Sequence, residues 1–328
     1  MNNVLLEVKD LETSLKINNE WLATVENISF ELSKGEVLGI VGESGCGKSI
    51  LSKSIIKLLP EKISKLSNGE VIFDGKRIDT LNEKQLLDIR GNDIAMIFQE
   101  PMTALNPVFT IKNQLVESIK SHKKISKKEA NKLAKDLLKK VGIARQDEIL
   151  NSYPHQLSGG MRQRVMIAMA ISCSPKLLIA DEPTTALDVT IQAQILDLLK
   201  ELQKETQMAI MMITHDLSVV AEFCDKVLVM YAGQIVEFGG IKEILHNPKH
   251  PYTQKLLLTI PKLKEEQKRL ETIEGIVPSI QAFHVNKCRF ANRCNKKLDI
   301  CNNQSPKMHV CEDVIVRCHL YKNEYKEI

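Results

Sequence analysis

The stretch Gly42-Glu-Ser-Gly-Cys-Gly-Lys-Ser49 matches the pattern G-x-x-x-x-G-K-[ST], and this match is the strongest indication of the fold. The apolar segment 36–41 predicts a strand before it, and a helical run that closes at Pro60 follows it. Glycines at such a strand-to-helix junction let backbone N–H groups curl around an anion, and the helix N-terminus adds partial positive charge. The stretch therefore predicts a phosphate-binding loop.

The loop pattern also predicts a role for each of its polar groups. Lys48 is expected to reach the β- and γ-phosphates of a nucleoside triphosphate, and the Ser49 hydroxyl is expected to ligate Mg²⁺. The loop residues expected to hold the nucleotide are Gly42, Glu43, Ser44, Gly45, Cys46, Gly47, Lys48 and Ser49.

Two carboxylates end an apolar segment further along, Leu177-Leu-Ile-Ala-Asp181-Glu182. A strand here would deliver both to its C-terminal end, where open α/β sheets place ligands. Asp181 fits the ligand on the metal side, and Glu182 fits the general base that polarises the attacking water. Carboxylates that merely end a strand in solvent are the alternative, which the upstream loop disfavours.

Hydrophobic patterning places the loop in an α/β fold. Further strands are predicted at 208–214 and 226–231, with a helix across 190–204, and this alternation indicates βαβ units and a mostly parallel sheet. Near-continuous apolar strands of this kind fit burial on both faces. The stretch from about 110 to 175 is helical and Lys-rich, and Ser126-Lys-Lys-Glu129 predicts a capping box.

Composition excludes several classes of protein. The 328 residues carry 45 Lys+Arg against 41 Asp+Glu, a net charge of +4, which is too mild to indicate a nucleic-acid partner. The aromatic content of 4% also argues against a base-stacking surface. No apolar run is long enough to span a bilayer, and the N-terminus MNNVLLEVKD lacks an export signal. We therefore expect a cytosolic chain of about two domains.

The character of the chain changes beyond about residue 240, where prolines and cysteines gather. A cytosolic chain keeps its thiols reduced, so a cysteine cluster there suggests metal before disulfide. Small buried hydrophobes are the alternative reading of these cysteines. Five of the eight cysteines lie in this tail: Cys288, Cys294, Cys301, Cys311 and Cys318.

A third motif, Leu157-Ser-Gly-Gly-Met-Arg-Gln163, precedes the two carboxylates. Its small residues at a helix start predict a second anion site. Because Lys48 already binds the nucleotide of its own chain, a second γ-phosphate contact implies a nucleotide held by another subunit. The order of these motifs, together with Gln99, Ala186-Leu187-Asp188 and His215, closely resembles the ATPases of ABC transporters over about residues 1–240.

The resemblance implies an α/β fold: an ABC-type P-loop ATPase with a RecA-like core, an N-terminal β subdomain and an inserted helical subdomain at about 105–175. Two such domains stack head to tail, so that Ser158, Gly159 and Gly160 face the partner's ATP. Gln99 would sense the γ-phosphate and water and join Asp181 and Ser49 at Mg²⁺. Asp188 would contact the opposing domain, and His215 the γ-phosphate. Either Trp21 or Leu15 is a candidate to stack on adenine.

The motifs around Gln99 and the tail stretch His250-Pro-Tyr-Thr253 resemble the oligopeptide/dipeptide (and nickel) importer branch of these ATPases. The resemblance implies a domain over 1–240 and a small Cys-rich C-terminal extension over 241–328. It also implies a [4Fe–4S] cluster, with Zn²⁺ or no metal as alternatives and Cys311 as a competing ligand. The cluster ligands implied by position are Cys288, Cys294, Cys301 and Cys318.

The importer branch implies an ATPase that powers peptide uptake from the cytoplasmic face of the cell membrane as a peripheral protein. Its partners would be two transmembrane permease subunits, an extracytoplasmic solute-binding protein and a homologous second ATPase subunit, a heterodimer being favoured over a homodimer. Uptake of nickel or a metal chelate is the alternative solute. A soluble ABC-type ATPase acting on DNA or ribosomes is an alternative of another class, disfavoured because no coiled-coil insertion or second cassette is visible.

Overall fold

A computed structural model describes residues 3–99, 104–185, 187–259, 273–283, 286–322 and 326–327. The contacts within the chain define two compact units. Unit 1 comprises Ser33–Glu36 and Thr80–Met211, and unit 2 comprises Asn2–Leu32, Val37–Asp79 and Met212–Ile328. The phosphate loop and the cysteine-bearing tail therefore belong to unit 2, whereas the carboxylates and the 157–163 motif belong to unit 1.

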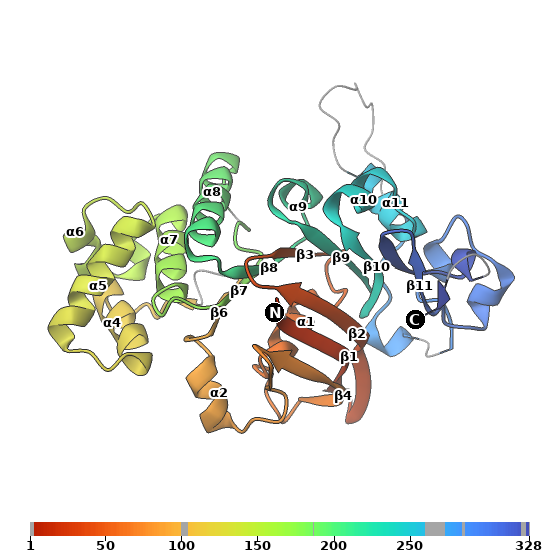
Figure 1. The fold of residues 1–328 in the computed structure, drawn as a ribbon, viewed down its shortest axis with the longest axis horizontal. Coiled ribbons are helices and arrows are strands. Elements are labelled where there is room, and N and C mark those ends of the chain that lie inside the picture. The colour runs from red at the N-terminus through yellow and green to blue at the C-terminus, as the bar shows by residue number, and fades with distance from the viewer. Residues whose placement is uncertain are drawn as a thin grey trace. The chain divides into compact units, whose positions relative to one another are not determined.

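Unit 2 contains a four-stranded sheet in the order β2-β1-β4-β5 (Figure 1). Its β1–β4 and β4–β5 pairs are antiparallel. Asn18 and Asn19 connect β1 to β2 with φ angles of 50° and 67°, a left-handed turn that asparagine tolerates well. The strands are β1 (Val4–Ile17), β2 (Glu20–Ser33), β4 (Ser64–Phe73) and β5 (Lys76–Arg77).

A second run of strands in unit 2 has the order β13-β11-β12-β10-β9-β3. The β3–β9 pair is parallel, and the pairs from β9 outward to β13 are antiparallel. The tail thus continues the sheet past residue 240, because β12 pairs with β10. The strands are β3 (Val37–Val41), β9 (Lys226–Tyr231), β10 (Gln234–Gly240), β11 (Met308–Cys311), β12 (Val314–Arg317) and β13 (Lys326–Glu327).

Helices α9 and α10 of unit 2 pack on this run of strands, whereas α1 contacts β1 of the four-stranded sheet. Gly39 of β3 allows a close approach of α9, since a Cβ there would lie 2.7 Å from Val220 Cγ1 and 3.0 Å from Cys224 Sγ. The described helices are α1 (Lys48–Ile55), α9 (Leu217–Phe223), α10 (Ile241–His246) and α11 (Pro251–Leu258), with short 3₁₀ turns η2 (Ile280–Ala282), η3 (Ala291–Arg293), η4 (Asp299–Asn302) and η5 (His319–Tyr321).

Unit 1 joins a parallel pair of strands to a group of helices. Strands β6 (Ile94–Ile97) and β7 (Leu177–Asp181) pair in parallel, and β8 (Ala209–Thr214) crosses the division between the units. Helices α4, α5, α6 and α7 pack on one another (Figure 1). The helical elements are α2 (Glu83–Ile89), α4 (Ile111–His122), α5 (Lys127–Lys140), α6 (Gln146–Asn151), η1 (Pro154–Gln156), α7 (Gly159–Ala170) and α8 (Val189–Thr206).

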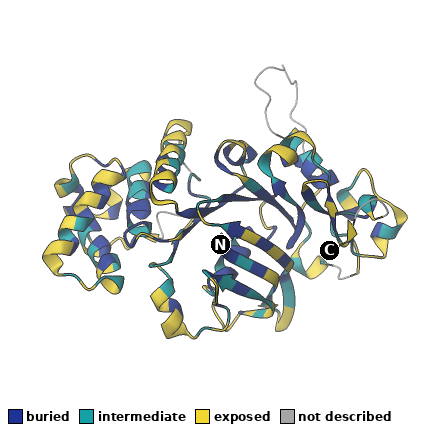
Figure 2. Ribbon diagram, in the orientation of Figure 1, coloured by how far each residue is buried: buried dark blue, intermediate teal, exposed yellow. Residues whose placement is uncertain are grey.

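Local patterns predicted many of these elements. Strands β7, β8 and β9 lie where predicted, and β3, β7 and β8 are buried throughout, as their apolar runs indicated (Figure 2). The capping box between Ser126 and Glu129 is confirmed at the start of α5. The helix after the phosphate loop ends at Ile55, sooner than Pro60 indicated, because Lys57 adopts a left-handed φ of 50°.

The prediction of a mostly parallel sheet was incomplete, because it missed the antiparallel strands β10 to β13. The domain boundary at residue 240 and the helical subdomain at about 105–175 stay predictions. Within the described parts of the chain, none of the helices combines the length and the apolar character that crossing a membrane requires.

Candidate nucleotide-binding site

The phosphate loop of unit 2 connects β3 to α1, as its pattern predicted. Gly42 has a φ of 154°, and a Cβ there would lie 2.3 Å from the carbonyl oxygen of Met230, so only glycine fits against β9. Gly45, at the exposed tip, has a φ of 78° and faces open space. Gly47 caps α1 with a φ of 104°. The loop is thus anchored at its base and open at its tip.

Lys48 places its ammonium group inside this loop. Its Nζ donates to the carbonyl oxygens of Gly42 at 2.7 Å and of Glu43 at 3.1 Å, and the side chain is buried. Ser49 is the second residue of α1. A buried ammonium beside glycine-rich backbone at a helix start fits the chemistry of a triphosphate and its Mg²⁺.

Cys46 forms the inner wall of the loop rather than its open surface. Its side chain is 1% exposed, and burial raises the pKa of its thiol although Lys48 opposes this shift. Gly233 N donates to Cys46 O at 2.8 Å, and Glu26 N donates to Gly233 O at 2.9 Å. The turn between β9 and β10 therefore supports the loop from behind.

Glu182, the predicted general base, lies in unit 1 just after β7. Its carboxylate Oε2 accepts hydrogen bonds from Gln99 Nε2 at 3.0 Å and from Thr185 Oγ1 at 2.8 Å. Its φ of 48° is left-handed, a strained conformation for glutamate that is typical of functional positions. Asp181, the last residue of β7, is buried. The structure thus brings together Gln99 and Glu182, which were predicted separately, and adds Thr185, which the sequence interpretation missed.

The 157–163 motif forms the start of α7. Ser158 is the N-cap, and its Oγ accepts a hydrogen bond from Met161 N at 3.3 Å, while Ser158 and Gly159 are exposed. Gly160 packs so closely on α8 that a Cβ would lie 2.8 Å from Ile191 Cγ2. The predicted second anion site therefore has an open helix N-terminus.

Asp188 and His215 also lie at helix starts. Asp188 is exposed and caps α8, accepting a hydrogen bond from Ile191 N at 3.0 Å. Ala186 lies outside the described residues. His215 is exposed between β8 and α9, beside Asp216, which caps α9. Trp21 lies on β2, 40% exposed, with Lys65 Nζ 4.7 Å from its ring centroid.

The tail cysteines come near one another without forming a metal site. Cys288 N donates to Cys301 O at 3.1 Å. Burial raises the pKa of Cys288 to about 11 and that of Cys318 to about 12, and neighbouring cysteines in the set add to both shifts. Burial therefore favours the protonated thiols in the metal-free chain.

In the described part of the chain, no group of three or more His, Cys, Asp or Glu residues could hold a metal ion. The structure therefore does not support the expected [4Fe–4S] cluster or Zn²⁺ site formed by Cys288, Cys294, Cys301 and Cys318. Cys311 lies fully buried on β11, opposite Val314 of β12.

Comparison with known proteins agrees with this geometry. A family model described as "ABC transporter" matches residues 25–185, and one described as "Oligopeptide/dipeptide transporter, C-terminal region" matches residues 236–301. The dimeric, post-hydrolysis structure of the ATP-binding cassette MJ0796 bound to ADP and Pi aligns with a TM-score of 0.65 at 29% identity, over 72% of this chain and 99% of that one. Fold and loop thus define an ATPase of the ABC class.

Two curated relatives refine this assignment. The Oligopeptide transport ATP-binding protein AppD of Bacillus subtilis (strain 168) is 48% identical over 326 residues, covering 99% of each chain. The Dipeptide transport ATP-binding protein DppD of the same organism is 48% identical over 309 residues, covering 94% of this chain and 92% of that protein. The chain belongs to the family of ATP-binding subunits of oligopeptide and dipeptide ABC transporters.

Proposed function

We propose that this chain hydrolyses ATP to power the uptake of dipeptides or oligopeptides through an ABC importer. The observation that carries the proposal is the full-length similarity to peptide-transport ATPases, which extends through the tail as well as the ATPase motifs. Binding of ATP would close a pair of ATPase subunits and hydrolysis would reopen them, so that the chemical step performs conformational work.

In the proposed chemical step, Lys48 and the loop amides bind the triphosphate. Glu182 accepts a proton from the attacking water, and its carboxylate is oriented by Thr185 and Gln99 through the hydrogen bonds described above. His215 contacts the γ-phosphate. When bound, Mg²⁺ neutralises phosphate charge, and the residues proposed to hold it are Ser49, Gln99 and Asp181.

A second ATPase subunit would complete each site. Ser158, Gly159 and Gly160 are proposed to contact the nucleotide of that subunit, and Asp188 its opposing domain. The exposed start of α7 supports this proposal, because a helix N-terminus carries partial positive charge that favours an anion.

The proposed assembly contains two transmembrane permease subunits, a homologous second ATPase and an extracytoplasmic solute-binding protein, with this chain on the cytoplasmic face of the membrane. Residues 1–240 would form the ATPase domain, including a helical subdomain at about 105–175, and residues 241–328 the extension. Nickel or metal-chelate uptake is the second candidate, and the names of the relatives favour peptides.

Uptake in cells tests the proposed solute. In a strain that lacks this gene, we expect the wild-type chain to restore accumulation of a labelled tripeptide and Glu182→Gln not to restore it. Labelled nickel uptake in the same strains is the control. Restoration of nickel uptake alone would contradict the peptide assignment and support the second candidate.

The iron–sulfur cluster of the tail stays a prediction, and metal analysis tests it. If the cluster forms, protein purified without oxygen is brown, absorbs broadly in the visible range and contains iron, because thiolate-to-iron bonds give these properties. The same preparation of a Cys288→Ser, Cys301→Ser variant is expected to be colourless. A colourless wild-type protein, with or without stoichiometric zinc, would contradict the cluster.

A further inference from the structure

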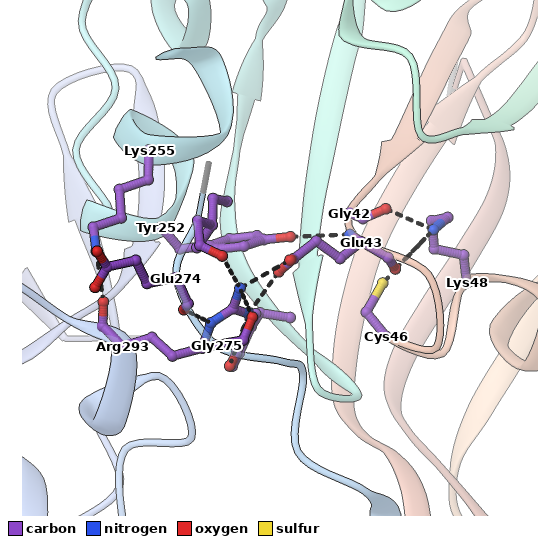
Figure 3. A network of polar contacts seen from close by, with 11 residues as sticks. Gly42, Glu43, Cys46, Lys48, Tyr252, Lys255, Glu274, Gly275 and Arg293 are labelled. Atoms are coloured by element: carbon purple, nitrogen blue, oxygen red, sulfur yellow. Dashed lines mark hydrogen bonds and ion pairs between the residues drawn. The ribbon is translucent and has the colours of Figure 1, made fainter. Parts of the chain in front are cut away.

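An arginine of the tail forms an ion pair with the phosphate loop (Figure 3). Arg293 Nη1 lies 2.7 Å from Glu43 Oε2, and Nη2 lies 2.9 Å from Glu43 Oε1, so the guanidinium grips the carboxylate with both nitrogens. The Arg293 side chain is 6% exposed and that of Glu43 is 26% exposed. Bidentate ion pairs that are partly removed from water are stronger and more directional than ion pairs on an exposed surface.

The rest of the Arg293 side chain is held by backbone carbonyl groups. Its Nε donates to Glu274 O at 2.9 Å, and its Nη2 donates to Ile273 O at 3.1 Å and to Gly275 O at 3.2 Å. Lys255 Nζ of α11 donates to the carbonyl oxygen of Arg293 at 2.8 Å. The three carbonyl groups fix the guanidinium in place, which lowers the entropic cost of its pairing with Glu43.

The backbone of Glu43 is held by the tail as well. Glu43 N donates to the hydroxyl oxygen of Tyr252 at 3.0 Å. Tyr252 is fully buried, and its ring centroid lies 4.8 Å from that of Tyr231 and 5.4 Å from that of Phe290. A hydroxyl fixed by aromatic packing makes a precise anchor.

The His-Pro-Tyr stretch orients this tyrosine. His250 caps α11 by accepting a hydrogen bond from Tyr252 N at its Nδ1, at 3.0 Å, and Pro251 occupies the first turn. His250 N in turn donates to Glu237 Oε2 of β10 at 3.0 Å. The stretch therefore orients the Tyr252 hydroxyl toward the phosphate loop.

We propose that Arg293, together with Tyr252, positions the phosphate loop and neutralises Glu43, so that the tail sets the affinity of the chain for nucleoside triphosphate. Lys48 Nζ lies 3.1 Å from the carbonyl oxygen of Glu43, so the residue that bears this carboxylate is a direct neighbour of the ammonium that meets the phosphates. An unpaired carboxylate there repels a triphosphate, and the pair with Arg293 removes that repulsion. Arg293 is a positioning residue, and this inference rests on the proposed nucleotide binding.

Binding of Mg–ATP to the full chain, measured by calorimetry, tests the inference. We expect Arg293→Gln to weaken binding about tenfold, the size of one lost charge-assisted hydrogen-bonded pair. The double variant Glu43→Gln, Arg293→Gln is expected to bind within about threefold of wild type, because it removes the carboxylate that the arginine neutralises. Arg293→Lys is expected to retain part of the affinity for Mg–ATP, since lysine keeps the charge but cannot form the bidentate pair.

Arg317→Gln is the matched control. Arg317 is also a buried tail arginine, and it donates to the carbonyl oxygens of Ile235 and Asn27 at 3.1 and 3.3 Å. We expect this variant to bind Mg–ATP like wild type.

Three results would overturn the inference: wild-type affinity in Arg293→Gln, an equal loss in Arg317→Gln, or no recovery in the double variant. Failure of wild type itself to bind Mg–ATP would instead contradict the proposed function.

Discussion

Glu182→Gln is expected to lower the rate of ATP hydrolysis by the assembled transporter at least about 100-fold, because an amide cannot take the proton of the attacking water. Glutamine matches glutamate in size and still accepts the hydrogen bond that Thr185 Oγ1 donates to Glu182 Oε2 at 2.8 Å. Binding of Mg–ATP is therefore expected to stay within a few-fold of wild type. Phosphate release and equilibrium nucleotide binding, measured on the same preparation, separate the two effects.

Glu201→Gln is a suitable control for this experiment, because Glu201 lies on the exposed side of α8 in the same unit. The Glu201→Gln variant loses the same charge without altering Asp181 or Glu182 at the end of β7. Undiminished hydrolysis in Glu182→Gln would assign the general base to another residue, and equal losses in both variants would point to a general effect of charge.

Lys48→Met is expected to weaken binding of Mg–ATP at least about 100-fold. The ammonium group is the buried charge of the loop, and charge-assisted hydrogen bonds contribute about 1.5–3 kcal/mol each. Methionine has a similar length and an apolar tip, so the 6% exposed site can retain its packing without the charge. Equilibrium binding of a fluorescent ATP analogue measures the loss, and thermal unfolding checks that the variant folds.

Lys53→Met provides the comparison for Lys48→Met. Lys53 lies on the last turn of the same helix, α1, and has no predicted phosphate role. It is expected to bind the analogue like wild type. If Lys48→Met retains its affinity for the ATP analogue, the assignment of this loop as the main phosphate-binding element is refuted.

Structural features that depend on residues adjacent in the chain could be predicted from the sequence. The glycines and lysine of the phosphate loop lie within Gly42–Lys48, so their spacing alone indicates the cradle that the structure shows. Runs such as Leu177–Asp181 predict buried strands for the same reason, because burial on both faces requires consecutive apolar side chains. The antiparallel strand β12 had no such signal, since its pairing with β10 depends on residues far away in the chain.

In the candidate site, too, the sequence indicated individual residues, and the structure was needed to show their contacts. Motif order indicated Gln99 and Glu182 separately, but only the structure shows that the amide donates to the carboxylate at 3.0 Å. Cysteine spacing predicted a metal cluster that the described residues do not support, because no group of three or more His, Cys, Asp or Glu residues among them could hold a metal ion.

The phosphate loop, the carboxylate-ended strand and the tail of distinct composition could all be read from residues adjacent in the chain. The pairing of Arg293 with Glu43 across 250 positions, and the bond from the backbone of Glu43 to Tyr252, became visible only in the folded chain. An ion pair needs two side chains that the whole fold brings together, and no local pattern records which two they are.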